Sequence, residues 1–423
     1  MSDIIETYKK NTRRSAKADE RVKRSIIGGN SRGAAVWQPH TLTVERGEGS
    51  QVFDADGREY TDLINNFTSL VHGHAYPPIV EAATRQIAQG TAWTANNHGQ
   101  AELAETLIER IPATESVRFT NSGTEAGMLA LQIARAITGR LKILMSRFGY
   151  HGSLMEFEIG TFGGFLDFHG ADTTHTATYN DADSFEQVLA EHGSEIAAVF
   201  VEPVMGAGGV VRGETEFLER VGKAANEAGA LFVVDEVITY RLSTGGEQMN
   251  RGIEPDLTML GKLIGGGFPV GAVGGRREYM KIFDPTEPKS FHSGTFVGNP
   301  VTMAAGVVST RELTQERIDT MAGLCDRLDV SLHSSARKLG LPFSTNREGS
   351  MLNVFFQHEA PTQGPLRNDE KEITLFYLAA LNRGLLMATR GMIALSTVMD
   401  EARIDDVAER AAAAMADLAA ELG

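Results

Sequence analysis

Short apolar runs alternate with helical patterns through the middle of the chain, from about residue 76 to residue 310. Four of these runs are short and consist mainly of apolar residues: 142–145, 196–201, 231–234 and 257–260. Apolar runs of this length without internal alternation are typical of strands that are buried on both faces of a parallel sheet. The pattern therefore predicts an α/β fold with a mostly parallel central sheet and helices on both of its faces.

The two ends of the chain have a different pattern. Residues 42–49 and 51–60 are typical of short antiparallel strands joined by glycine and Asp-Gly turns, and residues 3–26 of a solvated helix that leans on another element. The C-terminal part is rich in helix, with strands expected near 351–356 and near 386–387 or 393–395. These patterns predict a second, smaller α+β domain.

The changes of pattern suggest where the chain divides. We expect an N-terminal arm and part of the small domain in residues 1–75, a large domain in residues 76–310, and the rest of the small domain in residues 311–423. A chain of 423 residues with 42% apolar residues is long enough to bury a large core in such an arrangement.

The composition limits the classes of molecule that the protein is expected to bind. The net charge of −15 disfavours nucleic acid and anionic membranes, because both select basic surfaces. The N-terminus lacks an apolar signal segment, and no stretch approaches the length of a membrane span, so we expect a cytoplasmic protein. The single cysteine, Cys325, has no histidine nearby, which rules out a disulfide framework and a thiolate metal site, and we predict no bound metal.

Two polar side chains follow the last two of the four apolar runs. Lys262 closes the run at 257–260 and precedes a glycine cluster, and Asp235 closes the run at 231–234. A desolvated lysine loses its proton more readily and attacks an aldehyde to form a Schiff base, although a solvated lysine at a strand end gives the same pattern. Pyridoxal 5′-phosphate (PLP) requires a lysine for its aldehyde and a carboxylate for its pyridinium nitrogen. The pair therefore predicts a PLP site at the carboxyl edge of the sheet.

A candidate phosphate site precedes a helical pattern. Ser122, Gly123 and Thr124 stand between the end of a predicted strand and a helix with apolar residues at three-to-four spacing. A phosphate at this turn would meet free backbone N–H groups, two hydroxyl groups and the positive end of the helix dipole. An ordinary helix cap by Ser122 or Thr124 explains the same residues.

Three further residues belong to this group of candidates. The ring of Tyr150, after the run at 142–145, would stack on a flat pyridine ring, or it would pack in the core. Glu202 follows the run at 196–201, and Thr295 lies in a glycine-rich segment. These two residues add a carboxyl group and a hydroxyl group to the candidate PLP site.

The order and spacing of these short motifs resemble those of a known family. Ser-Gly-Thr at 122, Tyr-His-Gly at 150, Glu-Pro at 202, Asp-Glu-Val at 235, Gly-Lys at 261 and Gly-Thr-x-x-Gly-Asn-Pro at 294 resemble the class III, PLP-dependent aminotransferases of fold type I. The resemblance extends from about residue 26 to residue 405. Within the family, the chain is most similar to the branch that contains glutamate-1-semialdehyde aminomutases and β-amino-acid aminotransferases of the β-phenylalanine type.

The resemblance implies a role for each candidate. Lys262 would form the Schiff base with PLP and transfer the proton, and Asp235 would pair with the pyridinium nitrogen. The other residues implied at the cofactor are Ser122, Gly123 and Thr124 at the phosphate, Tyr150 on the ring, and Glu202. Thr295 matches a position that reaches the phosphate of the neighbouring subunit's cofactor, which implies a homodimer with shared active sites.

Two departures from the aminomutase pattern bear on the substrate. The chain has Asn-Ser-Arg ending at Arg32, where aminomutases have Asn-Ser-Pro-Val-Arg, and Arg390 followed by Gly391, where aminomutases have a glutamate in the second position. Both departures resemble the β-amino-acid enzymes. The guanidinium fork suits carboxylates, so Arg32 would bind a β-amino acid and Arg390 an α-amino or α-keto acid. Exposed salt bridges are the alternative explanation for both arginines.

The resulting hypothesis is an aminotransferase that acts between a β-amino acid, aromatic ones included, and 2-oxoglutarate or pyruvate. The alternatives are a glutamate-1-semialdehyde 2,1-aminomutase, against which the missing glutamate argues, an amine transaminase, and a catalytically silent PLP-binding protein. The segment 65–71 differs from the Ser-Trp-Gly-Pro motif of aminomutases, and we expect it to line the substrate pocket.

Overall fold

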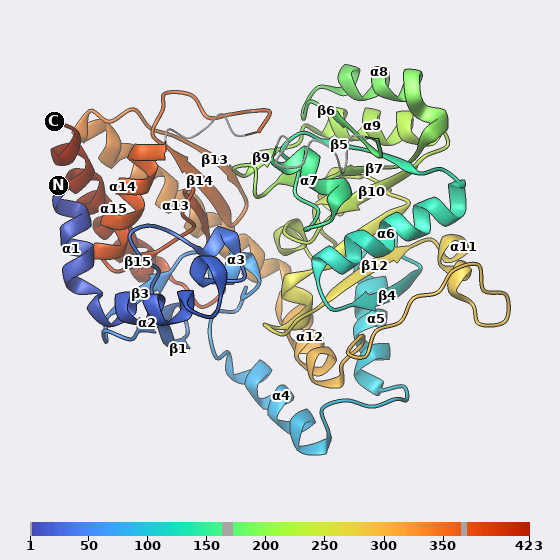
Figure 1. Cartoon of the computed structure of the whole chain (residues 1–423), viewed down its shortest axis with the longest axis horizontal. Helices are drawn as coiled ribbons and strands as arrows, with labels where there is room; N and C mark the ends of the chain where they lie inside the picture. The colour runs from blue at the N-terminus through green and yellow to red at the C-terminus, as the bar shows by residue number, and fades with distance from the viewer. Residues whose placement is uncertain (1, 163–171, 365–369) are drawn as a thin grey trace. The chain divides into compact units, whose positions relative to one another are not determined.

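The computed structural model describes residues 2–162, 172–364 and 370–423. These residues form two compact units (Figure 1). Unit 1 consists of Met1–Tyr76, Asp319–Pro361 and Leu366–Gly423, and unit 2 consists of Pro77–Ile318 and Thr362–Pro365.

A seven-stranded sheet forms the centre of unit 2, with the strand order β4-β12-β11-β10-β7-β5-β6. Its strands are β4 (Ser116–Thr120), β5 (Lys142–Ser146), β6 (Thr174–Ala177), β7 (Ile196–Val201), β10 (Leu231–Asp235), β11 (Leu257–Gly261) and β12 (Gly271–Gly275). Four of the six neighbouring pairs are parallel, and β12 is antiparallel to both β11 and β4. The mostly parallel sheet is confirmed, and each of the four apolar runs forms a strand.

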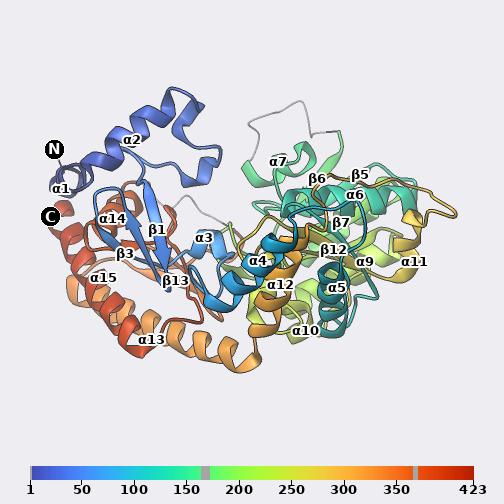
Figure 2. The ribbon, with the colours of Figure 1, turned by 90° about the horizontal axis from the view of Figure 1, so that it is seen from below.

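Helices cover both faces of this sheet. In β7, Ala198 and Phe200 belong to one buried cluster with residues of α6 (Gly123–Thr138), whereas Val199 and Val201 belong to another cluster with residues of α8 (Ala182–His192) and α9 (Thr215–Glu227). Successive side chains of a strand point to opposite faces, so the two clusters lie on opposite sides of the sheet. Figure 2 shows the strands between α6 and α9.

The other helices of unit 2 complete its outer layer. The helix α12 (Pro300–Glu312) packs against α4 (Pro77–Gln89) and α5 (His98–Arg110). The shorter elements are α7 (Met155–Phe162), α10 (Glu247–Arg251), α11 (Arg277–Met280), and the two-residue strands β8 (Val204–Met205) and β9 (Val211–Arg212).

The sequence pattern did not reveal β12, because three of its five residues are glycines, which are poor strand formers. The structure gives a reason for the glycine at its start. A Cβ atom on Gly271 would lie 2.0 Å from the carbonyl oxygen of Ser122. The missing side chain thus lets β12 pass directly behind the turn that begins α6.

Unit 1 contains two smaller sheets. The first has the order β1-β2-β3-β15, with β1 (Val44–Glu48), β2 (Gln51–Asp54), β3 (Glu59–Asp62) and β15 (Leu385–Leu386). The second has the order β13-β14-β16, with β13 (Ser344–Glu348), β14 (Met351–Phe355) and β16 (Met392–Ala394). The predicted antiparallel pairing near the N-terminus is confirmed. The two segments considered for a strand near the C-terminus, 386–387 and 393–395, both contribute one: β15 lies in the first sheet and β16 in the second.

The helices of unit 1 are α1 (Asp3–Asn11), α2 (Arg13–Lys23), most of α13 (Gln315–Leu339), α14 (Glu370–Asn382) and α15 (Glu401–Leu422). The short element α3 (Asn65–Thr68) has a positive φ at each of its residues. The expectation of one helix over residues 3–26 is wrong, because the chain leaves the helical conformation at Thr12. The Thr12 hydroxyl donates to the carbonyl oxygen of Tyr8 at 2.6 Å and lies 2.8 Å from the ring of His40. Such local side-chain bonds compete with helix continuation.

Cys325 is buried in the core of unit 1. Across the described parts of the chain, no helix has both the length and the apolar character that crossing a membrane requires.

Candidate active site

Asp235 and Lys262 reach the same edge of the sheet in unit 2. Asp235 is the last residue of β10, and Lys262 directly follows β11, the parallel neighbour of β10. The carboxyl ends of parallel strands form the usual ligand site of such sheets. Lys262 also has a φ of 50°, which is uncommon for a residue with a side chain and is typical of positions that the surrounding structure constrains.

The environment of Lys262 favours a neutral amine. Desolvation lowers the pKa of Lys262 from its ordinary value, while the nearby acids Asp235 and Glu202 oppose this shift. Because only the neutral amine is nucleophilic, the lowered pKa increases the fraction of Lys262 that can attack a carbonyl carbon.

Both carboxylate oxygens of Asp235 are engaged. Oδ1 accepts a hydrogen bond from the backbone N–H of Val237 at 2.9 Å, and Oδ2 lies 2.9 Å from Nδ1 of His151. His151 is buried against the rings of Phe157 and Phe200. These contacts hold the carboxylate in one orientation at the sheet edge.

The sequence reading did not single out His151, although it stands next to Tyr150 in the Tyr-His-Gly motif. An ionised carboxylate only accepts hydrogen bonds, so Nδ1 of His151 acts as the donor to Asp235. Its other nitrogen, Nε2, is buried and has no hydrogen-bond partner among the described residues. The sequence signal for His151 was its position next to Tyr150, a predicted site residue.

Glu202 contacts the backbone around Tyr150. Its Oε1 accepts from the N–H of Tyr150 at 2.9 Å, and its Oε2 accepts from the N–H of Gly206 at 3.0 Å. Burial raises the pKa of Glu202 to about 7, and the charge of Asp235 adds to this shift while His151 opposes it. The carboxylate of Glu202 therefore holds the loop that carries Tyr150, whose side chain is 36% exposed.

The first turn of α6 has the features of a helix cap. The Ser122 hydroxyl accepts from the N–H of Glu125 at 3.1 Å, and Glu125 accepts from the N–H of Asn121 at 2.8 Å. The cap uses one of the N–H groups at the helix start, while those of Gly123 and Thr124 have no acceptor within the helix. Capping and anion binding are thus compatible at this turn.

A close backbone approach joins this turn to the Tyr150 loop. A Cβ atom on Gly152 would lie 2.6 Å from Cα of Thr124, and Gly152 has a φ of 108°. The Thr124 hydroxyl oxygen accepts from the N–H of Ser153 at 3.2 Å. The structure therefore brings the phosphate candidates and the Tyr150 loop together.

These residues of unit 2 fit PLP on chemical grounds. A buried carboxylate with fixed orientation suits a pyridinium nitrogen, a helix start suits a phosphate, and a lysine with a lowered pKa suits an aldehyde. Thr295 is exposed, in a segment that also exposes 83% of Phe291 and 62% of Phe296.

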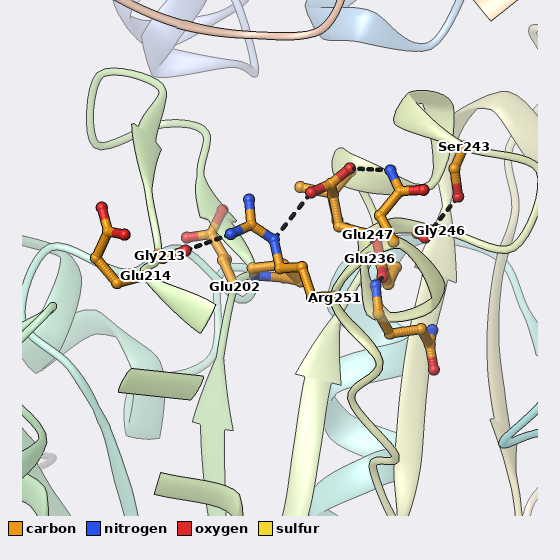
Figure 3. Close-up of polar contacts among 12 residues, drawn as sticks. Glu202, Gly213, Glu214, Glu236, Ser243, Gly246, Glu247 and Arg251 are labelled. Carbon is orange, nitrogen blue, oxygen red and sulfur yellow. Dashed lines mark hydrogen bonds and ion pairs between the residues drawn. The ribbon is translucent and has the colours of Figure 1, made fainter. Parts of the chain in front are cut away.

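A buried polar network supports the loop after Asp235 (Figure 3). Glu236 accepts hydrogen bonds from the Thr239 hydroxyl and from the N–H of Gln248. Glu247 accepts from Nε of Arg251 at 2.9 Å, and Arg251 also donates to the carbonyl oxygen of Gly213. The sequence did not predict this network, because it joins Glu236 to Gln248 and Arg251 to Gly213, residues that are separated along the chain.

The two candidate substrate residues belong to unit 1. Nη1 of Arg32 donates to Oδ1 of Asn66 at 2.6 Å, and the guanidinium carbon lies 5.8 Å from the centre of the Phe67 ring. Arg390 precedes Gly391; although its side chain is exposed, desolvation by the surrounding protein lowers the pKa of its guanidinium. Neither arginine forms an ion pair with an acid within the described ranges.

The chain is similar to known proteins of one family. Residues 33–415 match the family model "Aminotransferase class-III". The chain is 37% identical over 400 residues to a beta-phenylalanine transaminase of Variovorax paradoxus, covering 90% of this chain and 88% of the relative. It is 40% identical over 394 residues to a glutamate-1-semialdehyde 2,1-aminomutase of Thermomicrobium roseum, covering 88% and 90%. A solved structure described as a transaminase with PLP bound has a TM-score of 0.92 and 33% identity, covering 97% of this chain and 99% of that one.

Proposed function

The chain belongs to the class III aminotransferases, which are PLP-dependent enzymes, and we propose that it transfers an amino group between a β-amino acid and an α-keto acid such as 2-oxoglutarate or pyruvate. The observation that carries the proposal is Arg32. Its guanidinium is exposed, is held by a neutral amide, and has no acidic partner in the described part of the chain. An arginine held in this way retains its full charge for a substrate carboxylate.

The residues of unit 2 supply the chemical step. When bound, PLP withdraws electrons from the carbon atom that carries the amino group. Asp235 would pair with the protonated pyridine nitrogen, and His151 and Val237 donate to its two oxygens. Nζ of Lys262 would accept a proton from the substrate carbon that carries the amino group and deliver it to the former aldehyde carbon of the cofactor, because desolvation lowers the pKa of the amine and so increases its neutral fraction.

The turn of Ser122, Gly123 and Thr124 holds the phosphate, and Tyr150 stacks on the ring. Anchoring at both ends fixes the ring, which keeps the substrate carbon within reach of the lysine amine. Glu202 contributes indirectly, since it binds the backbone of Tyr150.

Two arginines match the two substrates of the transfer. In a β-amino acid the carboxylate is one carbon farther from the amino group than in an α-amino acid, so one arginine position does not suit both. We assign the β-carboxylate to Arg32 and the α-carboxylate to Arg390. The glycine after Arg390, at the place of the aminomutase glutamate, supports release of a keto product over retention of an intermediate.

The proposed assembly is a homodimer in which Thr295 reaches the phosphate bound by the neighbouring subunit. Phe291 and Phe296 support it, because large exposed aromatic side chains beside a site are typical of an interaction surface. Light scattering on the purified protein tests this state.

A single-turnover absorbance assay tests the function. The PLP form is mixed separately with each enantiomer of β-phenylalanine, with glutamate, with 1-phenylethylamine and with glutamate-1-semialdehyde. We expect one β-phenylalanine enantiomer to convert the cofactor to its pyridoxamine form, and 2-oxoglutarate or pyruvate to restore it. Reaction with the semialdehyde alone, giving 5-aminolevulinate without a keto acid, would establish an aminomutase instead. Reaction with 1-phenylethylamine alone would establish an amine transaminase.

A further inference from the structure

Four consecutive residues beside Arg32 have a left-handed backbone. The φ values of Asn65, Asn66, Phe67 and Thr68 are 51°, 51°, 53° and 72°, and none of the four is a glycine. The left-handed conformation costs about 1–2 kcal/mol for each residue with a side chain. Such strain persists only where the surrounding structure imposes it, and it is concentrated at functional sites.

Buried contacts hold this turn in place. Oδ1 of Asp62 accepts from the N–H groups of Ile64 and Asn65, both at 2.9 Å. The amide of Asn65 donates to the carbonyl oxygen of Ala394 at 2.6 Å, and Oδ2 of Asp62 lies 2.7 Å from Nε2 of His74. Asp62 and Asn65 are both buried, so the base of the turn is fixed from several sides within unit 1.

The turn presents the amide of Asn66 to Arg32. Its Oδ1 accepts from Nη1 of Arg32, and its Nδ2 donates to the hydroxyl of Ser69 at 3.0 Å. The guanidinium has donors only, so the amide must present its oxygen to Arg32. At the other end, the N–H of Arg32 donates to Oδ1 of Asn30 at 2.9 Å.

We propose that Asn66 is a positioning residue that determines carboxylate recognition by Arg32. It orients the guanidinium through one N–H group and leaves the remaining donors for a bidentate carboxylate. The acceptor must be neutral, since an acid at this position would pair with Arg32 and compete with the substrate. The inference rests on the proposed function, in which Arg32 binds the carboxylate of a β-amino acid.

Two substitutions separate orientation from charge. Asn66→Gly keeps the left-handed backbone accessible and removes the amide, whereas Asn66→Asp keeps the acceptor and adds a negative charge. Calorimetry on the PLP-bound enzyme measures the dissociation constants of 3-phenylpropanoate and of 3-phenylpropanamide, which has a similar shape without the charge. A further control is Asn180→Gly, which alters another asparagine with a positive φ, of 60°, in unit 2.

We expect Asn66→Asp to weaken binding of 3-phenylpropanoate by about 10- to 100-fold. The added carboxylate would pair with Arg32, and the ligand would lose a hydrogen bond to this charged group. Asn66→Gly should weaken it by about 3- to 10-fold, as for a lost neutral acceptor. Binding of the amide should change less than twofold in both variants, and Asn180→Gly should leave both ligands unaffected. In turnover, KM for β-phenylalanine should rise with kcat nearly unchanged, which a general loss of structure would not produce.

Failure of this inference is distinct from failure of the proposed function. If Arg32→Ala weakens binding of 3-phenylpropanoate but both Asn66 variants bind it like the wild type, the role of Asn66 is wrong and that of Arg32 stands. If Arg32→Ala also binds like the wild type, or the wild type does not bind the ligand, the carboxylate site itself is wrong. Circular dichroism checks that each variant is folded; should Asn66→Gly unfold, Asn66→Asp decides alone.

Discussion

Nδ1 of His151 lies 2.9 Å from Oδ2 of Asp235, and both side chains are buried. The histidine comes from the loop after β5 and the aspartate from the end of β10, so residues 84 positions apart in the sequence are in direct contact. A buried carboxylate requires such a partner, because a charge removed from water is costly when it is not hydrogen-bonded. The pair explains how a buried carboxyl group is held in one orientation at the sheet edge.

Removal of the Asp235 charge should impair catalysis more than folding. We expect Asp235→Asn to lower kcat by about 100-fold or more, a loss comparable to that of one preorganised electrostatic group in other enzymes. Steady-state kinetics with saturating PLP checks it. Asp256→Asn is the control, since Asp256 is another buried acid of unit 2, which accepts from the N–H of Phe232. Equal losses of kcat in the two variants would contradict a special role for Asp235.

Removal of the His151 donor should reduce PLP affinity. His151→Phe fills a similar space without donating to Asp235, and we expect the dissociation constant of PLP to rise about tenfold, as for one lost hydrogen bond to a charged group. His151→Asn can place an N–H near the same position and should recover part of the affinity. Absorbance titration of each apoenzyme with PLP measures the dissociation constants of the two variants. Wild-type affinity in His151→Phe would show that the ring only fills space.

Gly152 should tolerate no side chain. Gly152→Ala places a Cβ atom 2.6 Å from Cα of Thr124, so the Tyr150 loop or the start of α6 must move. We expect the variant to purify with little PLP. Gly139→Ala is a matched control at the other end of α6, with a φ of 70° and open space around its Cβ position. That change should cost about 1 kcal/mol of stability from backbone strain alone, with normal PLP content.

The buried carboxyl of Glu236 should make stability depend on pH. Burial raises the pKa of Glu236 from 4.5 to about 7. The folded protein therefore keeps a proton that the unfolded chain releases, and stability is lost as pH rises from about 4.5 to about 7, by roughly 3 kcal/mol for a shift of this size.

Glu236→Gln should make the fall of the melting temperature across this pH range shallower without abolishing it, because Glu202 also has a raised pKa of about 7. Glu216→Gln, which alters an exposed glutamate, is the control and should leave the pH profile unchanged. A profile of Glu236→Gln that matches the wild type would show that Glu236 does not titrate in this range.

Arg32 should act on substrate binding rather than on the chemical step. We expect Arg32→Ala to raise KM for β-phenylalanine by about 10- to 100-fold through lost charge-assisted hydrogen bonds, with a much smaller effect on KM for 2-oxoglutarate. Arg46→Ala is the control, because Arg46 is an exposed arginine of unit 1 that stacks on the ring of Phe53. An unchanged KM for β-phenylalanine would remove Arg32 from the carboxylate site.

The sequence alone was sufficient for the features that depend on local pattern. Short apolar runs predicted the parallel strands, because a strand buried on both faces has few polar positions. The polar residues that follow those runs, Asp235 and Lys262, indicated the sheet edge where the cofactor chemistry is expected. Neither conclusion required knowledge of which strands are neighbours.

Only the tertiary structure revealed the contacts between segments that are distant in sequence. The pairing of His151 with Asp235, the support of the Tyr150 backbone by Glu202, and the contact of Arg32 with Asn66 join residues from separate elements. Their partners follow from strand order and loop conformation, which single-residue patterns do not encode. The glycine-rich β12 and the left-handed turn at 65–68 escaped prediction for the same reason: long-range contacts impose conformations that the local sequence disfavours.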